Sequence, residues 1–438
     1  MSRMLAILIA AGTWAPTAHA QTINVQTLTS RDPTLTWKTL DLPNGKPANY
    51  TLGIGSGAFR HKDDPANTFW TVGDRGPNMT CAEGKPLLGD APAAECAKRA
   101  NGRIYPTPDY TPSIYRISID RAAGSFKLLE TIPLRKAKSG VNISGLLNPQ
   151  TVATKDAGVD LQGRDLPDNA DNMDLEAIVR LTDGSFWVAD EMGPSIAHVS
   201  RDGRIMKRFV PADAAKDYAG AEAEIVASLP AILSKRQGNR GFESIAISPD
   251  ETHLYFIMQN PLANPDAKAF QGARNSRLFK MERASGKLVG EYVYQLENPS
   301  SFGFDPTTRQ SDPRISELMA IGADKLIVLE RTEKTTKLFE INLAGATNIL
   351  GSQWDNVATS PSLEQLPDAP GVTPLAKTLR FDTFRDAKDA PEKIEGLAIL
   401  EDGSLMLIND NDFGIRGDDT KVLIVKGAIQ ADPAIWKK

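Results

Sequence analysis

Acidic side chains recur at two positions of a repeating sequence pattern. The first position is a glutamate near the start of an apolar, β-branched run, and it is filled by Glu176, Glu243, Glu317 and Glu395. The second position follows the next apolar run and carries Asp74, Asp190 or Glu191, Gln259, Glu330 and Asp410. If each pair of runs forms antiparallel strands, the start of one strand lies beside the end of the next. We therefore expect these side chains to converge at one end of their sheets.

A cluster of carboxylates needs a counter-charge, because buried like charges repel and raise one another's pKa. A divalent cation is the simplest counter-charge, and the predicted ligands are Asp74, Glu176, Glu191, Glu243, Glu317, Glu330, Glu395, Asp410 and Asp412. Oxygen ligands, in a chain with only four histidines, favour a hard metal, with Ca²⁺ preferred and Mg²⁺ or Mn²⁺ left open. The alternative is pairing with arginines, and those in or beside the same motifs are Arg75, Arg240, Arg274, Arg277 and Arg331.

The pattern predicts hydrolysis by a metal-activated water, because the signals of other mechanisms are absent. The sequence contains no Gly-x-Ser-x-Gly nucleophile motif and no glycine-rich phosphate loop ending in Lys-Ser or Lys-Thr. A carboxylate not needed for the metal would act as general base, and the candidate catalytic residues are Glu176, Glu243 and Glu395. Guanidinium groups match phosphate oxygens, so we expect a small anionic substrate, a phosphate ester. Its predicted binding residues are Arg75, Arg240, Arg331 and Asn411.

The elements that would position these residues are short strands joined by tight turns. Residues 174–211 contain four such strands, two of whose connections are the turns Thr182–Ser185 and Asp202–Gly203, which predicts one antiparallel blade. The same order recurs within residues 57–134, 241–296, 316–343 and 394–426. We therefore predict an all-β fold, a β-propeller of five four-stranded blades around a central channel, or six if residues 345–390 contain a degenerate blade. The run 35–42 is expected to complete the last blade and close the ring.

The N-terminal segment predicts export. Arg3 precedes the short apolar run Leu5–Ala11, and Ala18-His19-Ala20 matches the small-x-small pattern that signal peptidase requires. We therefore expect a cleaved signal peptide at residues 1–20, a periplasmic or secreted protein, and one domain over residues 21–438. The insertion loop 78–112 contains the chain's two cysteines, Cys81 and Cys96. In an exported chain these cysteines predict a disulfide.

Composition excludes two classes of partner. The chain has a net charge of −5 and no cluster of lysines and arginines, which argues against nucleic acid and against an anionic membrane surface. No segment after the N-terminus approaches the ~20 apolar residues that span a bilayer. The sequence leaves the oligomeric state open.

Taken in order, the motifs resemble the phytase-like family of bacteria and plants, the "esterase-like activity of phytase" domain. The resemblance lies in Val72–Asn78, Asp174–Ile178, Val188–Pro194, Gly241–Ile245, Ile394–Ala398 and Asn409–Gly414. It implies a secreted or periplasmic β-propeller with recurrent glutamates and aspartates that hydrolyses phosphate esters. The histidine acid phosphatases are not similar, because the chain lacks Arg-His-Gly-x-Arg.

Two other functions fit the same residues. One is a lactonase-type or other ester hydrolase, since gluconolactonase-like propellers also carry a Glu-Gly opening, as at Glu395-Gly396, near a central calcium. The other is a non-catalytic ligand-binding propeller in which a structural Ca²⁺ stiffens the ring.

Overall fold

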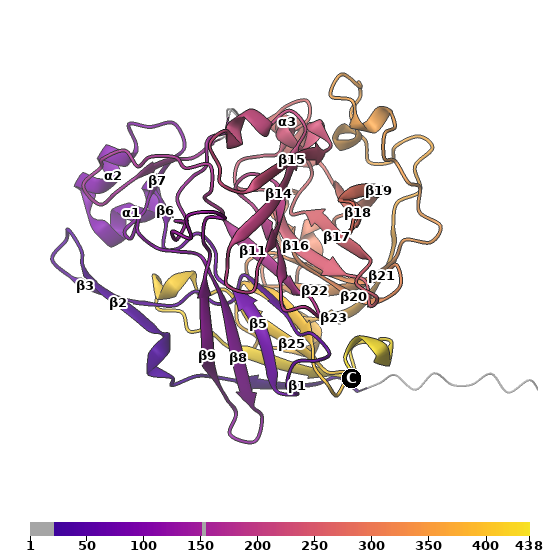
Figure 1. Ribbon diagram of the computed structural model, residues 1–438, viewed down its shortest axis with the longest axis horizontal. Coiled ribbons are helices and arrows are strands. Elements are labelled where there is room, and N and C mark those ends of the chain that lie inside the picture. Colours follow the sequence, from indigo (N-terminus) through magenta and orange to yellow (C-terminus); the bar gives the residue numbers. More distant parts are fainter. Residues whose placement is uncertain (1–21, 151–154) are drawn as a thin grey trace, which may run out of the picture.

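The strands lie around a central axis as the blades of a propeller in the computed structural model, which describes residues 22–150 and 155–438 (Figure 1). The predicted signal peptide lies outside the described residues. Within them, four sheets have four strands each and a fifth sheet has five. The predicted β-propeller is therefore confirmed.

Each blade runs from an inner strand at the channel to an outer strand at the rim. Blade 1 consists of β4 (Gly57–Phe59), β5 (Thr68–Val72), β8 (Ser113–Asp120) and β9 (Ser125–Pro133). Blade 2 consists of β11 (Leu175–Arg180), β12 (Phe186–Asp190), β13 (Ser195–Val199), β14 (Ile205–Pro211) and a parallel fifth strand, β15 (Glu224–Leu229). Blade 3 consists of β16 (Phe242–Ile247), β17 (His253–Met258), β18 (Asn275–Glu282) and β19 (Lys287–Gln295). Blade 4 consists of β20 (Arg314–Gly322), β21 (Lys325–Arg331), β22 (Thr336–Asn342) and β23 (Ala376–Asp382). Blade 5 consists of β24 (Ile394–Ile399), β25 (Leu405–Asn409), β26 (Val422–Lys426) and β1 (Asn24–Leu28).

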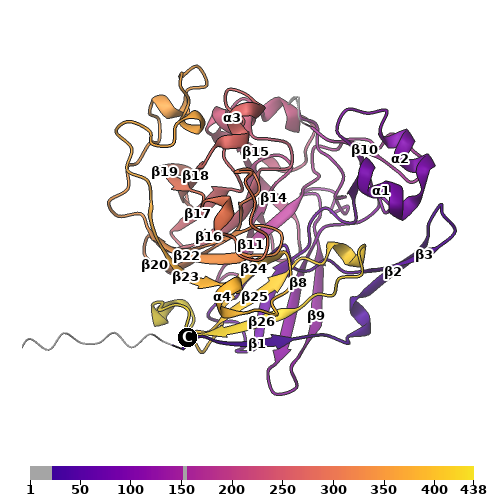
Figure 2. The same ribbon diagram turned by 180° about the vertical axis from the view of Figure 1, so that it is seen from behind.

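The ring is closed by β1, which pairs antiparallel with β26 from Asn24↔Lys426 to Leu28↔Val422 (Figure 2). The prediction that the run 35–42 closes the ring is wrong. That run contains β2 (Thr36–Asp41), which instead forms a hairpin with β3 (Pro47–Thr51). The physical reason is burial: Leu28 of β1 is fully buried in the core between blades 5 and 1, whereas no residue of β2 is buried.

The described residues form five blades and not six. The segment 345–375 contains the 3₁₀ helices Gln353–Asp355 and Leu363–Gln365 and no strand among its described residues. The strand that follows it, β23, is the outer strand of blade 4.

Five apolar cores lie between neighbouring blades, one at each junction around the ring. Because a blade is covered on both faces, its inner strands are buried along nearly their whole length and do not alternate between buried and exposed residues. All five residues of β5 and of β12 are buried, for example. The turns that connect the strands use glycine at positive φ, as at Gly184, Gly203 and Gly403.

A β-bulge interrupts the start of four inner strands, β11, β16, β20 and β24. A bulge leaves an extra residue outside the ladder and re-aims its side chain. The residues at this position are Glu176, Glu243, Ser316 and Glu395.

The insertion after β5 forms a small lobe beside blade 1 (Figure 1). It contains α1 (Cys81–Leu88), α2 (Asp90–Cys96) and a three-stranded sheet of β6 (Met79–Thr80), β7 (Gly102–Ile104) and β10 (Ala157–Val159). The predicted disulfide between Cys81 and Cys96 is present and joins the two helices. Two short helices, α3 (Ala267–Gly272) and α4 (Thr383–Asp386), lie in loops of blade 3 and blade 4. None of the described helices is long and apolar enough to cross a membrane.

Candidate active site

A pocket of about 460 Å³ lies at the end of the channel where the bulged inner strands begin. All five blades and the insertion lobe contribute to its wall. Its charged lining residues are Asp74, Arg75, Glu83, Arg103, Asp174, Glu176, Glu191, Arg240, Glu243, Arg314, Arg331, Glu333, Lys393, Glu395, Asp410, Asp412 and Arg416.

The pairing of the first two strands defines three equivalent positions in blades 2 to 5. The first residue starts the inner strand or directly precedes it, the second is the bulged residue, and the third ends the second strand or directly follows it. In blade 2 these are Asp174, Glu176 and Glu191, since Leu175 pairs with Asp190 and the Glu191 N–H donates to the Asp174 carbonyl. The same pairing gives Gly241, Glu243 and Gln259 in blade 3, Arg314, Ser316 and Arg331 in blade 4, and Lys393, Glu395 and Asp410 in blade 5. Asp74 follows the second strand of blade 1.

Charge is therefore distributed unevenly around the mouth of the channel. Outside the insertion lobe, the charged lining residues of blades 1 and 2 are acidic except for Arg75, whereas blade 4 contributes two arginines, Arg314 and Arg331, and one acid, Glu333. Blade 5 carries both signs.

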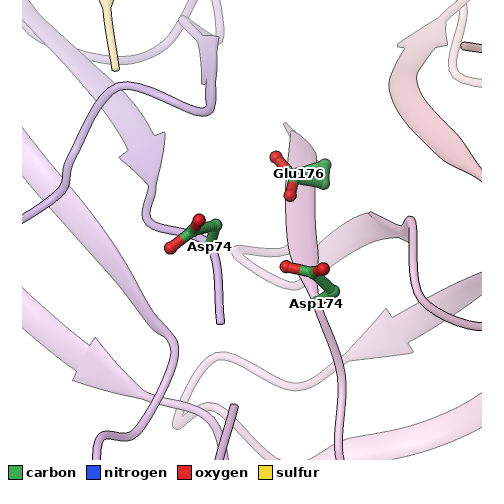
Figure 3. A group of neighbouring side chains, drawn as sticks. All are labelled: Asp74, Asp174 and Glu176. Carbon is green, nitrogen blue, oxygen red and sulfur yellow. The ribbon is translucent and has the colours of Figure 1, made fainter. Parts of the chain in front are cut away.

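The acidic side contains a tight cluster of Asp74, Asp174 and Glu176 (Figure 3). One carboxylate oxygen from each lies within 4.8 Å of the others. Glu176 extends from β11 and Asp174 from the residue before β11, and both lie on the side of that strand where Asp74 lies. Burial raises the pKa of Asp174 to about 6, although Arg75 lowers it, and burial followed by neighbouring carboxylates raises the pKa of Asp74 and of Glu176.

Two buried carboxylate oxygens on this side accept no hydrogen bond. They are Oδ2 of Asp174, which lies 3.2 Å from Arg75 Nε, and Oε1 of Glu191, which lies 3.8 Å from Arg240 Nη1. Burial raises the pKa of Glu191 to about 7. Buried carboxylates with free oxygen lone pairs are the ligands that Ca²⁺ and Mg²⁺ prefer. The donor set therefore fits a hard divalent cation.

The opposite side of the pocket is lined by two guanidinium groups, those of Arg314 and Arg331. Arg331 donates to Ser316 Oγ at 2.9 Å and to Glu395 Oε1, and Arg314 donates to Glu333 at 2.8 Å. Burial, followed by the charges of Arg331 and Arg240, lowers the pKa of Arg314. Mutual repulsion among these guanidinium groups would be relieved by an anion.

Two glutamates separate the acidic and cationic sides. Glu243 accepts hydrogen bonds on both oxygens, from Gln259 Nε2 and from Ser316 Oγ at 2.8 Å. Glu395 accepts from Arg331 through Oε1, and burial raises its pKa to about 7. Such a group can accept or donate a proton near neutral pH.

The structure brings most of the predicted site residues to this pocket. Those that line it are Asp74, Arg75, Glu176, Glu191, Arg240, Glu243, Arg331, Glu395, Asp410 and Asp412. Asp190 does not face it, because its carboxylate pairs with Arg208 and accepts from Ser195. Lys393 forms ion pairs with both Asp410 and Asp412, so part of the negative charge of these two acids is already balanced.

Three predicted residues lie elsewhere. The bulge in blade 4 places Ser316 at the mouth, and Glu317 instead accepts backbone N–H groups of Ala58 and Leu318, each at 3.0 Å. Glu330 accepts from Tyr294 at 2.8 Å and pairs with Lys377, outside the pocket. Asn411 donates to Thr51 at 2.8 Å and fixes its own loop. The expectation that these three residues face the pocket is therefore wrong.

Seven charged residues of the pocket wall were not predicted, namely Glu83, Arg103, Asp174, Arg314, Glu333, Lys393 and Arg416. Of these, Asp174, Arg314 and Lys393 each stand two residues before a bulged residue. Their spacing from Glu176, Ser316 and Glu395 is the signal that could have found them.

Comparison with solved structures gives only loose overlaps. A PQQ-bound aldose sugar dehydrogenase from Streptomyces coelicolor is 10% identical, with a TM-score of 0.31 over 93% of this chain and 99% of that chain. A putative 6-phosphogluconolactonase from Bacteroides uniformis is 9% identical, with a TM-score of 0.31 over 89% of this chain and 90% of that chain. Overlaps this loose carry no argument about function.

Sequence comparison is more specific. A secreted protein from Arthroderma benhamiae is 30% identical over 139 residues, which are 28% of this chain and 27% of that protein. The chain thus matches only about a quarter of that relative's length. The sequence profile of the phytase-like family, described as esterase-like activity of phytase, matches residues 95–413. This match spans most of the chain and three of the five blades entirely, so the chain belongs to the phytase-like family, whose description is that of an ester hydrolase.

Proposed function

We propose that this protein is a secreted, metal-dependent hydrolase of phosphate esters that acts at the mouth of the propeller channel. The observation that carries the proposal is the separation of charge around the mouth, with a carboxylate cluster on blades 1 and 2 and arginines on blade 4. A phosphate ester is matched to both sides, because its oxygens bind a cation and guanidinium groups alike.

Asp74, Asp174 and Glu176 would hold the cation, with Glu191 as a neighbouring donor. Ca²⁺ is the preferred ion, with Mg²⁺ or Mn²⁺ as alternatives, since all donors are carboxylate oxygens. A bound cation of this kind supplies charge neutralisation and a water of lowered pKa.

Arg314 and Arg331 would bind the phosphoryl oxygens of the ester. Each of the three nitrogens of Arg331 donates a hydrogen bond, to Ser316, to the carbonyl of Thr332 and to Glu395, so its remaining N–H groups have a fixed direction. A guanidinium fixed in this way orients the phosphoryl group and favours a tetrahedral anion over a neutral carbonyl. Arg240, whose Nη1 lies 3.8 Å from Glu191 Oε1 on the acidic side, would contact the same group.

Glu395 is the proposed general acid–base group. Its Oε1 accepts from Arg331, so Oε2 is the atom that would take a proton from water or give one to the departing alcohol. A pKa of about 7 allows both roles at neutral pH. Glu243 has both oxygens engaged and would position Ser316 rather than move a proton.

The test is metal analysis of the purified protein, followed by assays of phosphomonoesters, phosphodiesters and lactones with and without a chelator. We expect bound metal, turnover of a phosphate ester, and loss of that turnover on chelation. Asp174→Asn should lose metal and turnover together. The matched control Glu330→Gln removes a buried carboxylate that lies outside the pocket, and it should retain both.

Other outcomes would replace the proposal. Turnover of lactones without turnover of phosphate esters would assign the lactonase-type function. Bound metal that raises the melting temperature without turnover of any ester would leave a ligand-binding propeller with a structural ion.

A further inference from the structure

A second pocket, of about 470 Å³, lies beyond the ends of the blade 2 strands. Its wall is formed by the end of β14, the 3₁₀ helices Ala215–Tyr218 and Ala231–Lys235, and the start of α3. Pockets of this size accommodate small organic molecules. It is separate from the site at the channel mouth, because the two pockets share no lining residue.

The inner wall of this pocket carries one buried charge, that of Arg236. Its side chain is 4% exposed, and it donates to the carbonyl of Gln237 at 3.1 Å, to the carbonyl of Met192 and to Gln150 Oε1. No carboxylate among the described residues forms an ion pair with it, and the other charged lining residues are not buried. A buried charge without a counter-ion is unfavourable.

The acids whose charges act on Arg236 are Glu191, Asp190 and Asp156, and each of them is paired with another arginine. Asp190 pairs with Arg208, both being buried, and Glu191 lies 3.8 Å from Arg240. Burial lowers the pKa of Arg236 despite the charges of these acids. An anionic ligand in the pocket would supply the missing counter-charge.

The other lining residues indicate what kind of organic group would accompany the charged group of this anion. Pro194, Pro211, Pro265 and Tyr218 contribute apolar surface, together with several alanines. The rim of the pocket carries charges of both signs. The positive ones belong to Lys216 and Lys235, and the negative ones to Asp213, Asp217 and Asp266. A flat organic body therefore fits the wall, and its charged group fits Arg236.

The pocket is also a neighbour of the channel mouth. Two loops form the partition between them: Glu191 faces the mouth while Gly193 and Pro194 face the second pocket, and Arg240 faces the mouth while Arg236 faces the second pocket. Arg236 donates to the carbonyl of Met192, the residue directly after Glu191. Consecutive Cα atoms are only about 3.8 Å apart, so the two sites are separated by little more than one loop.

We propose that this pocket is a second binding site, for a cyclic organic anion whose carboxylate or phosphate group is held by Arg236. The ligand is either a separate small molecule or the far end of an ester bound at the mouth. The site does not depend on the proposed metal, because no member of the carboxylate cluster lines it.

Calorimetric titration of the full-length protein in EDTA tests the site, with benzoate and phenyl phosphate as probes and neutral benzamide as the control ligand. We expect benzoate to bind with a Kd of about 1 mM and benzamide not to bind. Arg236→Gln should weaken benzoate binding by about tenfold or more, the loss typical of a charge-assisted hydrogen bond. Lys235→Gln removes the adjacent rim charge and should leave binding unchanged.

Ala214→Phe fills the pocket without altering Arg236, so it tests the site even if Arg236→Gln disturbs the loop at Met192. We expect it to abolish benzoate binding at an unchanged melting temperature. Equal benzoate binding by wild type and Ala214→Phe, or no binding to wild type, would overturn the proposal. In the metal-loaded protein, competition between benzoate and 4-nitrophenyl phosphate assigns the site to the ester's far end, and binding without competition assigns it to a separate molecule.

Discussion

Removing the metal should make the stability of the protein fall as pH rises from 5 to 8. In the metal-free protein, burial raises the pKa of Asp174 from 3.8 to about 6. The folded state then holds a proton that the unfolded state releases, so the free energy of unfolding is highest below pH 4. It declines between the unfolded and the folded pKa and levels off above pH 6. The raised pKa values of Glu191 and Glu395, each about 7, extend the decline toward neutral pH.

The size of the effect follows from the shift at Asp174 alone. A change of one pKa unit corresponds to about 1.4 kcal/mol, so the carboxylate destabilises the metal-free fold by about 3 kcal/mol above pH 6. With an unfolding entropy of about 2.1 cal/mol/K per residue, a chain of this length loses about 3 °C in melting temperature. A cation present at about 100 times its Kd stabilises the fold by about 2.7 kcal/mol, which would raise the melting temperature again by a similar number of degrees.

The assay is differential scanning calorimetry at pH 5 and pH 8, in EDTA and in excess Ca²⁺. The gain in melting temperature on adding Ca²⁺ should be larger at pH 8 than at pH 5, where protons compete with the metal. Asp174→Asn should show a smaller decline with pH and little gain from Ca²⁺, whereas the exposed Asp109→Asn should behave as wild type. A gain from Ca²⁺ that is equal at both pH values, or that survives in Asp174→Asn, would refute the assignment of the cation to this cluster.

Three further predictions concern other parts of the molecule. Glu395→Gln should lower kcat by about 10²- to 10⁴-fold with an unchanged melting temperature, as expected for loss of a general acid–base group. A steady-state assay on the best phosphate ester measures kcat, and full activity of the variant would remove Glu395 from the mechanism. Glu291→Gln should raise the free energy of unfolding at pH 9 but not at pH 5, because burial raises the pKa of Glu291 to about 8 and the fold loses stability as this carboxyl ionises. Urea titration of both proteins at both pH values measures the change in the free energy of unfolding, and an equal change at pH 5 and pH 9 would contradict the reasoning. A chain that begins at Thr29 lacks β1 and should unfold at a much lower temperature than a chain that begins at Gln21 in a thermal scan, since blade 5 loses its outer strand and the buried Leu28.

The blades were predictable from the sequence because their turns and apolar runs are local signals. Asp-Gly turns such as Asp202–Gly203 and the continuously buried β12 are visible without any tertiary information. The strand that closes the ring was not predictable from the sequence, because β1 and the run 35–42 have similar local patterns. Only pairing with β26, nearly 400 residues away in the chain, distinguishes them.

The site was predictable where a repeat keeps the same residue type and not where it changes. Glu176, Glu243 and Glu395 occupy equivalent bulges, so the repeat placed them correctly. In blade 4 the bulge falls on Ser316, and the neighbouring Glu317 turns into the wall. A shift of one residue moves a side chain to the other face of a strand, and the sequence does not specify on which residue a bulge falls.

The bulges also separate the residues that meet the ligand from the residues that hold the blades together. Each bulged side chain stands outside its ladder, while the apolar neighbours on the same strand fill the cores between blades. Exchanging acid for base at such a position alters the field at the mouth and leaves every interblade core intact. The arginines of blade 4 show the same freedom at the two positions beside the bulge, because Arg314 and Arg331 are equivalent to Asp174 and Glu191 of blade 2. The ring can therefore be retuned one blade at a time, and relatives with the same scaffold can present different charge patterns to different esters.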